Sequence, residues 1–151
     1  MWEGLFSFVN ILALAAWAAL ILAPRSALLN TAILYLGVGL LCLIYTFFII
    51  LLMTGIIDGN PVPGAAAGGA NFTTIEGVRG IFLSDGGVVI GWTHYLAFDL
   101  FVGLWISKDA DAKGISRIVQ APVLFATLMA GPAGLLVWLI YRERYRKTRI
   151  A

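Results

Sequence analysis

The apolar run from Gly91 to Ile106 contains two ionisable side chains, His94 and Asp99, and His94 is the only histidine in the chain. An imidazole or a carboxyl group loses its hydration in hydrocarbon, so an ionisable residue inside an apolar helix needs a partner and commonly marks a functional site. Both side chains belong to the types that act as general acids and bases. We therefore predict His94 and Asp99 as the catalytic residues, with both side chains facing protein or a lined cavity and not lipid.

Each of the two side chains also has a purely structural interpretation. The Asp99 carboxyl group could form a structural hydrogen bond, with Gln120, Tyr35 or a backbone amide as its partner, and His94 could be a neutral imidazole bonded to a backbone carbonyl. The two residues are five positions apart, about 140° around an ideal helix. They therefore cannot pair on one regular face, and each is expected to have its own partner. No metal site is expected, because a single histidine needs several carboxylate ligands beside it.

The composition places the chain in a membrane. Hydrophobic residues make up 61% of the 151 positions and charged residues 12%, about half of the charged share of soluble proteins. A soluble domain of this length cannot hide so much apolar surface, so membrane lipids are the expected surroundings. Five of the ten basic residues lie between Arg142 and Arg149, directly after an apolar segment, as in a cytoplasmic anchor. No basic face or recognition module accompanies them, so nucleic acid is excluded as the expected partner.

Four apolar segments have the length that a membrane-spanning helix requires. They cover residues 5–23, 27–57, 87–106 and 115–141. These segments predict an all-α fold, an integral membrane four-helix bundle that forms one domain over residues 1–151. Pro132 lies inside the fourth segment and has no amide hydrogen for the carbonyl of Leu128, so a kink is expected there.

A short helix is predicted before the third segment. The sequence Thr73-Thr74-Ile75-Glu76 fits a capping box, in which Thr73 is the N-cap and Glu76 reaches back to its amide. Apolar residues then share one face. We predict a short amphipathic helix over residues 74–85 that lies at the membrane interface.

The basic residues predict an orientation. With four spans, the terminal cluster and Arg79 lie on one side, which gives six basic residues there, against Arg25, Lys108, Lys113 and Arg117 on the other. The side with more basic residues faces the cytoplasm. We therefore expect both the N-terminus and the C-terminus to be cytoplasmic. No transit peptide precedes the first apolar segment, so the expected location is the inner (cytoplasmic) membrane of a bacterium.

Small and polar residues at helical spacing predict the faces through which membrane helices pack. In the second segment these residues are Tyr35, Gly39, Cys42 and Thr46, and in the fourth they are Gln120, Thr127, Gly131, Gly134 and Trp138.

Two strings of residues resemble those of a known family. The first is Gly-Trp-Thr-His-Tyr-Leu-Ala-Phe-Asp-Leu-Phe-Val-Gly-Leu-Trp-Ile from Gly91 to Ile106, and the second is Gly131-Pro132-Ala133-Gly134-Leu135-Leu136; Asp109, Gly114-Ile115, Arg117 and Pro122 lie between them. These residues resemble the ABA4-like family of small membrane proteins, the family of the plant protein required for neoxanthin formation in abscisic-acid biosynthesis. The resemblance extends over most of the chain from Leu5 to Arg142 and is strong from the amphipathic segment onward.

The resemblance implies a four-helix membrane protein of carotenoid (xanthophyll) metabolism. Neoxanthin forms from violaxanthin by an isomerisation that opens an epoxide, so a related enzyme, a carotenoid epoxide isomerase, would need an acid and a base. His94 and Asp99 have these types, and His94, Tyr95 and Asp99 are expected at the polar end ring of the ligand. The aromatic residues near them are expected to bind the polyene in a groove opened by the kink at Pro132. These candidate binding residues are Trp92, Tyr95, Phe98, Phe101, Trp105 and Trp138. No cofactor beyond a bound carotenoid or other isoprenoid is expected.

A different class of function also fits the chain. A short membrane protein with an apolar outer surface could be a non-catalytic accessory subunit of a larger photosynthetic or respiratory complex, with other membrane-protein subunits as its partners. A transporter or channel is less favoured, because the chain lacks an internal repeat.

Overall fold

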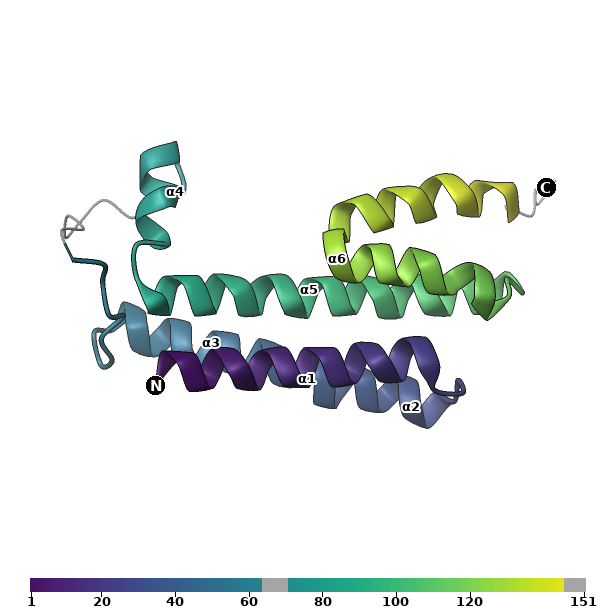
Figure 1. Cartoon of the computed structure of the whole chain (residues 1–151), viewed down its shortest axis with the longest axis horizontal. Coiled ribbons are helices and arrows are strands. Elements are labelled where there is room, and N and C mark those ends of the chain that lie inside the picture. Colours follow the sequence, from purple (N-terminus) through teal and green to yellow (C-terminus); the bar gives the residue numbers. More distant parts are fainter. Residues whose placement is uncertain (64–70, 146–151) are drawn as a thin grey trace, which may run out of the picture.

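The computed structural model describes residues 1–63 and 71–145, and the fold of these residues is all-α (Figure 1). The long helices are α1 (Trp2–Leu22), α5 (Asp85–Ala112), α6 (Arg117–Arg142) and a composite helix formed by α2 (Ala27–Ala32), a π-helical stretch (Ile33–Gly39) and α3 (Leu40–Met53). All four are long and apolar enough to cross a membrane. The prediction of an all-α membrane protein with four long apolar helices is confirmed.

Local signals in the sequence set the helix ends. α1 stops one residue before the extended Ala23 and Pro24, as expected before a proline. Ser84 caps α5, because its hydroxyl accepts a hydrogen bond from the amide of Gly87 at 3.0 Å. α5 therefore begins two residues earlier than predicted and continues to Ala112, six residues past the predicted end.

α5 is the central helix, and α1, α3 and α6 all pack against it (Figure 1). Small residues allow these helices to approach closely. A Cβ atom on Gly103 would lie 2.7 Å from Cζ3 of Trp17 on α1, and one on Gly37 would lie 3.1 Å from Leu100. The fully buried Trp17 and Leu100 thus fill the centre of the bundle.

α6 reverses its direction at Ala130, where the backbone has φ −153° and ψ 67°. Its two halves, residues 117–129 and 131–142, lie beside each other (Figure 1). A Cβ atom on Gly134 in the second half would lie 2.5 Å from Cα of Thr127 in the first. The predicted kink is therefore present, but it is a hairpin and not a bend. We attribute it to Pro132, which lacks an amide hydrogen, and to the two glycines, which allow the halves to touch.

The hairpin places both ends of α6 at the C-terminal end of α5. At the start of α6, Arg117 bonds the carbonyl of Ala23 at 2.6 Å, and at its end Arg142 bonds Asp109 with 2.9 Å between Nε and Oδ2. Figure 1 shows the N-terminus at the opposite end of the bundle. This arrangement differs from the predicted one, in which a fourth helix crosses the bundle and both termini lie on one side.

The short helix before α5 is present as α4 (Ile75–Ile81), which ends four residues before the predicted end. Its N-cap is Thr74 and not Thr73, because the Thr74 hydroxyl accepts the hydrogen bond of the Gly77 amide at 3.0 Å. The side chain of Asn71 instead accepts the Thr73 amide at 3.0 Å, which holds Thr73 outside the helix. α4 stands at an angle to the long helices, beside the N-terminal end of α5 (Figure 1).

The packing face predicted for the second apolar segment is wrong. Tyr35, Cys42 and Thr46 are exposed, and the buried residues are Ile33, Gly37, Val38 and Leu41. The predicted residues recur at helical spacing, but they lie on the side of the helix that faces outward. The face predicted for the fourth segment is confirmed: its five small and polar residues are all buried.

The outer surface of the bundle is apolar. Large aliphatic side chains such as Leu28, Leu36, Leu43 and Ile140 are more than 60% exposed. A soluble protein rarely exposes so much contiguous apolar surface, whereas lipid tails cover it without cost. These helices therefore suit contact with membrane lipids.

Candidate functional site

Asp99 lies halfway along α5 and is buried, with 8% of its surface exposed. One of its carboxyl oxygens, Oδ2, has no hydrogen-bond partner among the described residues. An unpartnered polar atom in an apolar interior is costly, so such atoms need a specific explanation. The prediction that Asp99 faces protein is confirmed.

The Asp99 carboxyl group packs against the backbone at the break in α6. A Cβ atom on Gly131 would lie 2.5 Å from Cγ of Asp99 and closer still to Oδ1. Only a glycine therefore lets the carboxyl group reach this position. Gly131 begins the second half of α6, and the free amides at the start of a helix favour a carboxylate or another hydrogen-bond acceptor.

Tyr95 lies one turn before Asp99 on the same face of α5 and reaches the same point. Its hydroxyl group donates to the carbonyl of Met129 at 3.5 Å. Met129 lies two residues before Gly131, against which the Asp99 carboxyl group packs. A carboxyl group, a phenol and two backbone groups released by the helix break therefore converge. We call Tyr95, Asp99, Met129 and Gly131 the polar site. It can donate and accept hydrogen bonds and can hold a proton.

His94 is not part of the polar site. Its side chain is exposed and contacts the rings of Phe98 and Tyr45, with centroid distances of 4.6 and 5.4 Å. The prediction that His94 faces protein or a lined cavity is wrong. A residue about 140° around the helix from Asp99 turns to the opposite side of α5, where α3 covers it only in part.

A groove opens beside the polar site, along the half of α5 that α6 does not reach. It has a volume of about 380 Å³ and is lined by Phe6, Phe82, Val88, Gly91, Trp92 and Tyr95. Close contacts of the Trp92 side chain shape the groove. The rings of Trp92 and Tyr95 stack with centroids 5.1 Å apart, and the Trp92 indole donates to Asn10 on α1 at 3.0 Å. Tyr95 belongs to both regions, because its ring lines the groove and its hydroxyl group lies in the polar site.

The structure separates the six aromatic residues that were predicted to bind a ligand. Trp92 and Tyr95 line the groove, whereas Phe98 and Phe101 are exposed outside it. The guanidinium group of Arg142 covers Trp105, 5.2 Å from its ring centroid. Trp138 is fully buried, and its indole donates to Asp109 at 3.1 Å. These two tryptophans thus hold the second half of α6 in place.

Sequence reasoning missed the groove residues outside α5. Phe6 comes from α1, and Phe82 follows α4 and packs on α5, where a Cβ atom on Gly91 would lie 2.6 Å from Cε1 of Phe82. Phe82 was recognisable as part of an amphipathic segment, but no sequence signal joins it to Gly91. Gly131 was recognisable as a packing residue, and its contact with Asp99 became visible only in the structure.

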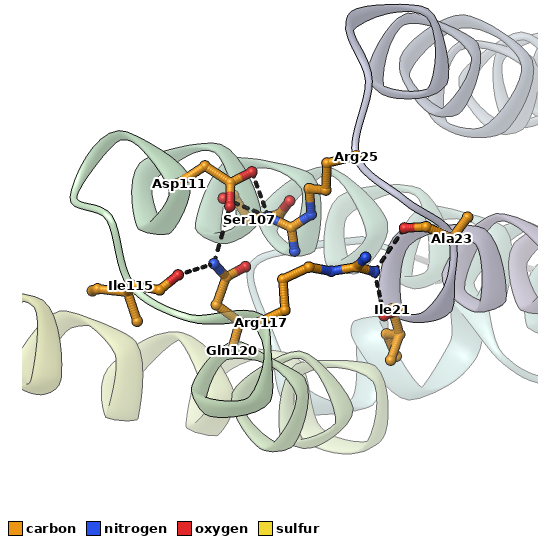
Figure 2. A network of polar contacts seen from close by, with 8 residues as sticks. All are labelled: Ile21, Ala23, Arg25, Ser107, Asp111, Ile115, Arg117 and Gln120. Atoms are coloured by element: carbon orange, nitrogen blue, oxygen red, sulfur yellow. Dashed lines mark hydrogen bonds and ion pairs between the residues drawn. The ribbon is translucent and has the colours of Figure 1, made fainter.

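A second polar cluster closes the other end of the bundle (Figure 2). Arg25 bonds Asp111 at 2.7 Å, and Gln120 donates to the same carboxylate at 3.0 Å. Arg117 donates to the carbonyls of Ile21 and Ala23 and so caps the C-terminus of α1. Gln120 is therefore not the partner of Asp99. We assign this cluster a structural role, since it ties α1, α5 and α6 together.

Among residues 1–63 and 71–145, no group of three or more His, Cys, Asp or Glu side chains lies close enough together to hold a metal ion.

Comparison with known proteins gives one match. No curated protein and no solved structure matches the chain significantly. Residues 4–138 match the family described as ABA DEFICIENT 4-like. The matched range contains the whole groove, the polar site and the hairpin contact between Gly134 and Thr127. The resemblance seen in the two sequence strings therefore extends over nearly all of the chain, and the protein belongs to the ABA4-like family.

Proposed function

We propose that the protein binds a carotenoid or a related oxygenated isoprenoid within the membrane. In this proposal the oxygenated end group contacts Tyr95 and Asp99, and the hydrocarbon chain lies in the groove between Phe6, Phe82 and Trp92. The observation that carries the proposal is the position of the polar site at one end of an apolar groove. Membership of the ABA4-like family supports the choice of ligand.

The dimensions and chemistry of the groove suit one end of such a molecule. Its volume of about 380 Å³ lies at the lower end of the range for small-molecule sites, roughly 300–1,000 Å³. A long polyene would place its end ring in the groove and leave the rest of its chain among the lipids. An end-ring oxygen would meet the Asp99 carboxyl group or the Tyr95 hydroxyl group, the two side chains nearby that can donate a proton.

The same arrangement suits an isomerisation of an epoxide end ring. A protonated Asp99 would donate its proton to the epoxide oxygen while the carbon–oxygen bond breaks, which leaves a hydroxyl group on the ring. Loss of a carbon-bound proton to a base then forms the allene, so no net oxidation or reduction takes place. The carboxylate that Asp99 becomes is the nearest such base. His94 lies on the other side of α5, so the geometry favours Asp99 with Tyr95 and not the predicted pair of His94 and Asp99.

Filling the groove tests the proposal. Val88 lines the groove and is 45% exposed, whereas Val137 on α6 is 51% exposed and lies outside it. The chain is expressed in a carotenoid-producing host, purified in a mild detergent and extracted for pigment. We expect Val88→Trp to lose the bound pigment and its effect on the host's xanthophylls, and the matched variant Val137→Trp to retain both.

The alternative function predicts a different result. If the unsubstituted protein carries no pigment, leaves the host's xanthophylls unchanged and copurifies with a larger complex, the groove holds a neighbouring helix and the protein is an accessory subunit. The expected location, the cytoplasmic membrane of a bacterium, is tested by fractionating the cells that produce the protein.

A further inference from the structure

The two ends of the bundle carry opposite charge. The end that holds the C-termini of α1, α5 and α6 contains six basic residues, Arg25, Lys108, Lys113, Arg117, Arg142 and Arg144, and three acidic ones, Asp109, Asp111 and Glu143. The opposite end holds the start of α1, α4 and the start of α5, and Arg79 is its one basic residue among those described. Four acidic residues accompany Arg79 there: Glu3, Asp58, Glu76 and Asp85.

We propose that the basic end faces the anionic cytoplasmic leaflet, so that the N-terminus, α4 and the groove lie in the opposite leaflet, from which the protein takes its ligand. The proposed orientation does not depend on which ligand binds. The leaflet from which the ligand enters rests on the function proposed above. Compared with the orientation expected for four complete spans, this one moves the N-terminus and α4 to the other side of the membrane and leaves Arg142 on the cytoplasmic side.

Helix lengths decide the number of crossings. α5 has 28 residues, about 42 Å at 1.5 Å per residue, which exceeds a hydrocarbon core of about 30 Å. The two halves of α6, residues 117–129 and 131–142, reach only about 20 and 18 Å. Neither half crosses the core, and the contact between Arg142 and Asp109 returns the chain to the side on which α6 began. The described part of the chain therefore crosses the membrane three times, and Met1 and Arg142 lie on opposite sides.

The hairpin also changes the count of basic residues. Topology follows the number of Lys and Arg residues close to the ends of the spans, and acidic residues contribute little. Four complete spans divide all ten basic residues six to four, whereas the hairpin divides the seven described ones six to one. The difference of five residues therefore gives a clear preference for one orientation.

The groove lies near the acidic end. Val88 and Gly91 belong to the first two turns of α5, and Phe82 comes from the segment that follows α4. Its opening is therefore in the leaflet away from the cytoplasm. The polar site lies deeper, halfway along α5, so a ligand that enters from this leaflet reaches Asp99 with its leading end.

Cysteine labelling tests the orientation. In a Cys42→Ala background, single cysteines replace Val62 at the acidic end and Ser116 and Glu143 at the basic end; all three positions are exposed. Spheroplasts react with a charged, membrane-impermeant maleimide before and after permeabilisation. We expect Val62→Cys to react in intact spheroplasts, and Ser116→Cys and Glu143→Cys to react only after permeabilisation.

Other labelling patterns overturn the orientation. Four complete spans would place positions 62 and 143 on one side and position 116 on the other. The reversed orientation of the hairpin would expose positions 116 and 143 together.

A second labelling experiment tests the leaflet of the ligand separately. A lipophilic maleimide reacts with Val88→Cys in the groove and with Val137→Cys outside it, in a carotenoid-producing host and in a carotenoid-free host. We expect the pigment to protect position 88 and to leave position 137 unchanged. Equal reaction in both hosts refutes the ligand and leaves the orientation standing.

Discussion

Asp99 and Asp109 lie on the same helix, but their side chains are in very different states. Asp109 shares its two oxygens among Lys113, Trp138 and Arg142, with distances from 2.6 to 3.1 Å. Asp99 is more deeply placed and leaves Oδ2 without a partner. A fully satisfied carboxylate stabilises a fold, whereas an unsatisfied one costs free energy. Asp99 is therefore the carboxyl group whose presence demands a functional explanation.

Replacing Asp99 by Asn distinguishes a catalytic role of the carboxyl group from a purely structural one. The amide has nearly the same shape, so the fold and the bound pigment should remain, but it cannot donate the proton that opens an epoxide. We expect the conversion of xanthophylls in a carotenoid-producing host to fall by roughly 10²–10⁴-fold. Asp111→Asn makes the same chemical change in the structural cluster and should leave conversion unaltered.

The His94→Gln variant completes this comparison. His94 is exposed and lies away from the polar site, so the substitution should change neither conversion nor pigment binding. Full activity of Asp99→Asn would show that Asp99 has only a structural role. A loss of activity in His94→Gln would restore the histidine to the mechanism.

At the scale of the element, the hairpin of α6 creates both the polar site and the groove. Its reversal releases the backbone groups of Met129 and Gly131 near Asp99, and its shortness leaves the first turns of α5 uncovered. Broken helices in membrane proteins commonly place binding groups at mid-membrane in this way.

Gly134→Ala should weaken the hairpin. The new Cβ atom would lie 2.5 Å from Cα of Thr127, and a backbone atom cannot move aside as a side chain can. Overpacking of this kind costs typically 1–3 kcal/mol, so the melting temperature in detergent should fall by several degrees. Gly4→Ala on α1 meets nothing within 4 Å and serves as the control. An unchanged melting temperature for Gly134→Ala would mean that the two halves do not touch.

Some features of the fold could be predicted from the sequence alone, and others could not. The four apolar helices, the kink at Pro132 and the burial of Asp99 followed from local composition, because hydrocarbon length, the missing proline amide and the cost of a carboxyl group act locally. The reversal at Ala130 did not follow, since a proline in an apolar helix is equally compatible with a modest bend. The contacts that hold the hairpin, from Gly134 to Thr127 and from Arg142 to Asp109, join residues that no sequence pattern connects.

At the scale of the whole molecule, the charged side chains of the described residues lie at the two ends, except Asp99, and the outer surface between the ends is largely apolar, with His94 as an exposed polar residue. Cys42 lies on this outer surface, near the middle of the second long helix, and its thiol is free and exposed. A charged maleimide stays in water, because moving a charge into hydrocarbon is costly, and the middle of this helix lies among lipid tails. The exposure of Cys42 is therefore exposure to lipid and not to water.

Cys42 should resist a charged maleimide while the protein remains in the membrane and should react after denaturation in SDS. The cysteine of Val62→Cys, which lies in a loop, provides the reactive control in the same preparation. Rapid labelling of Cys42 in intact membranes would show that water reaches this face, and would contradict the arrangement of the bundle in lipid.

The π-helical stretch from Ile33 to Gly39 has a consequence for comparing this chain with its relatives. Such wide turns accommodate extra residues within a helix without breaking it. Removing one residue there would return the segment to the regular period and rotate Leu40–Met53 by about 100°. Leu41 would leave the core, and Tyr45 would lose its contact with His94. Relatives with a regular second helix should therefore align with this chain only when a one-residue gap is placed between positions 33 and 39. The helical spacing of the lipid-facing residues before that gap does not continue across it.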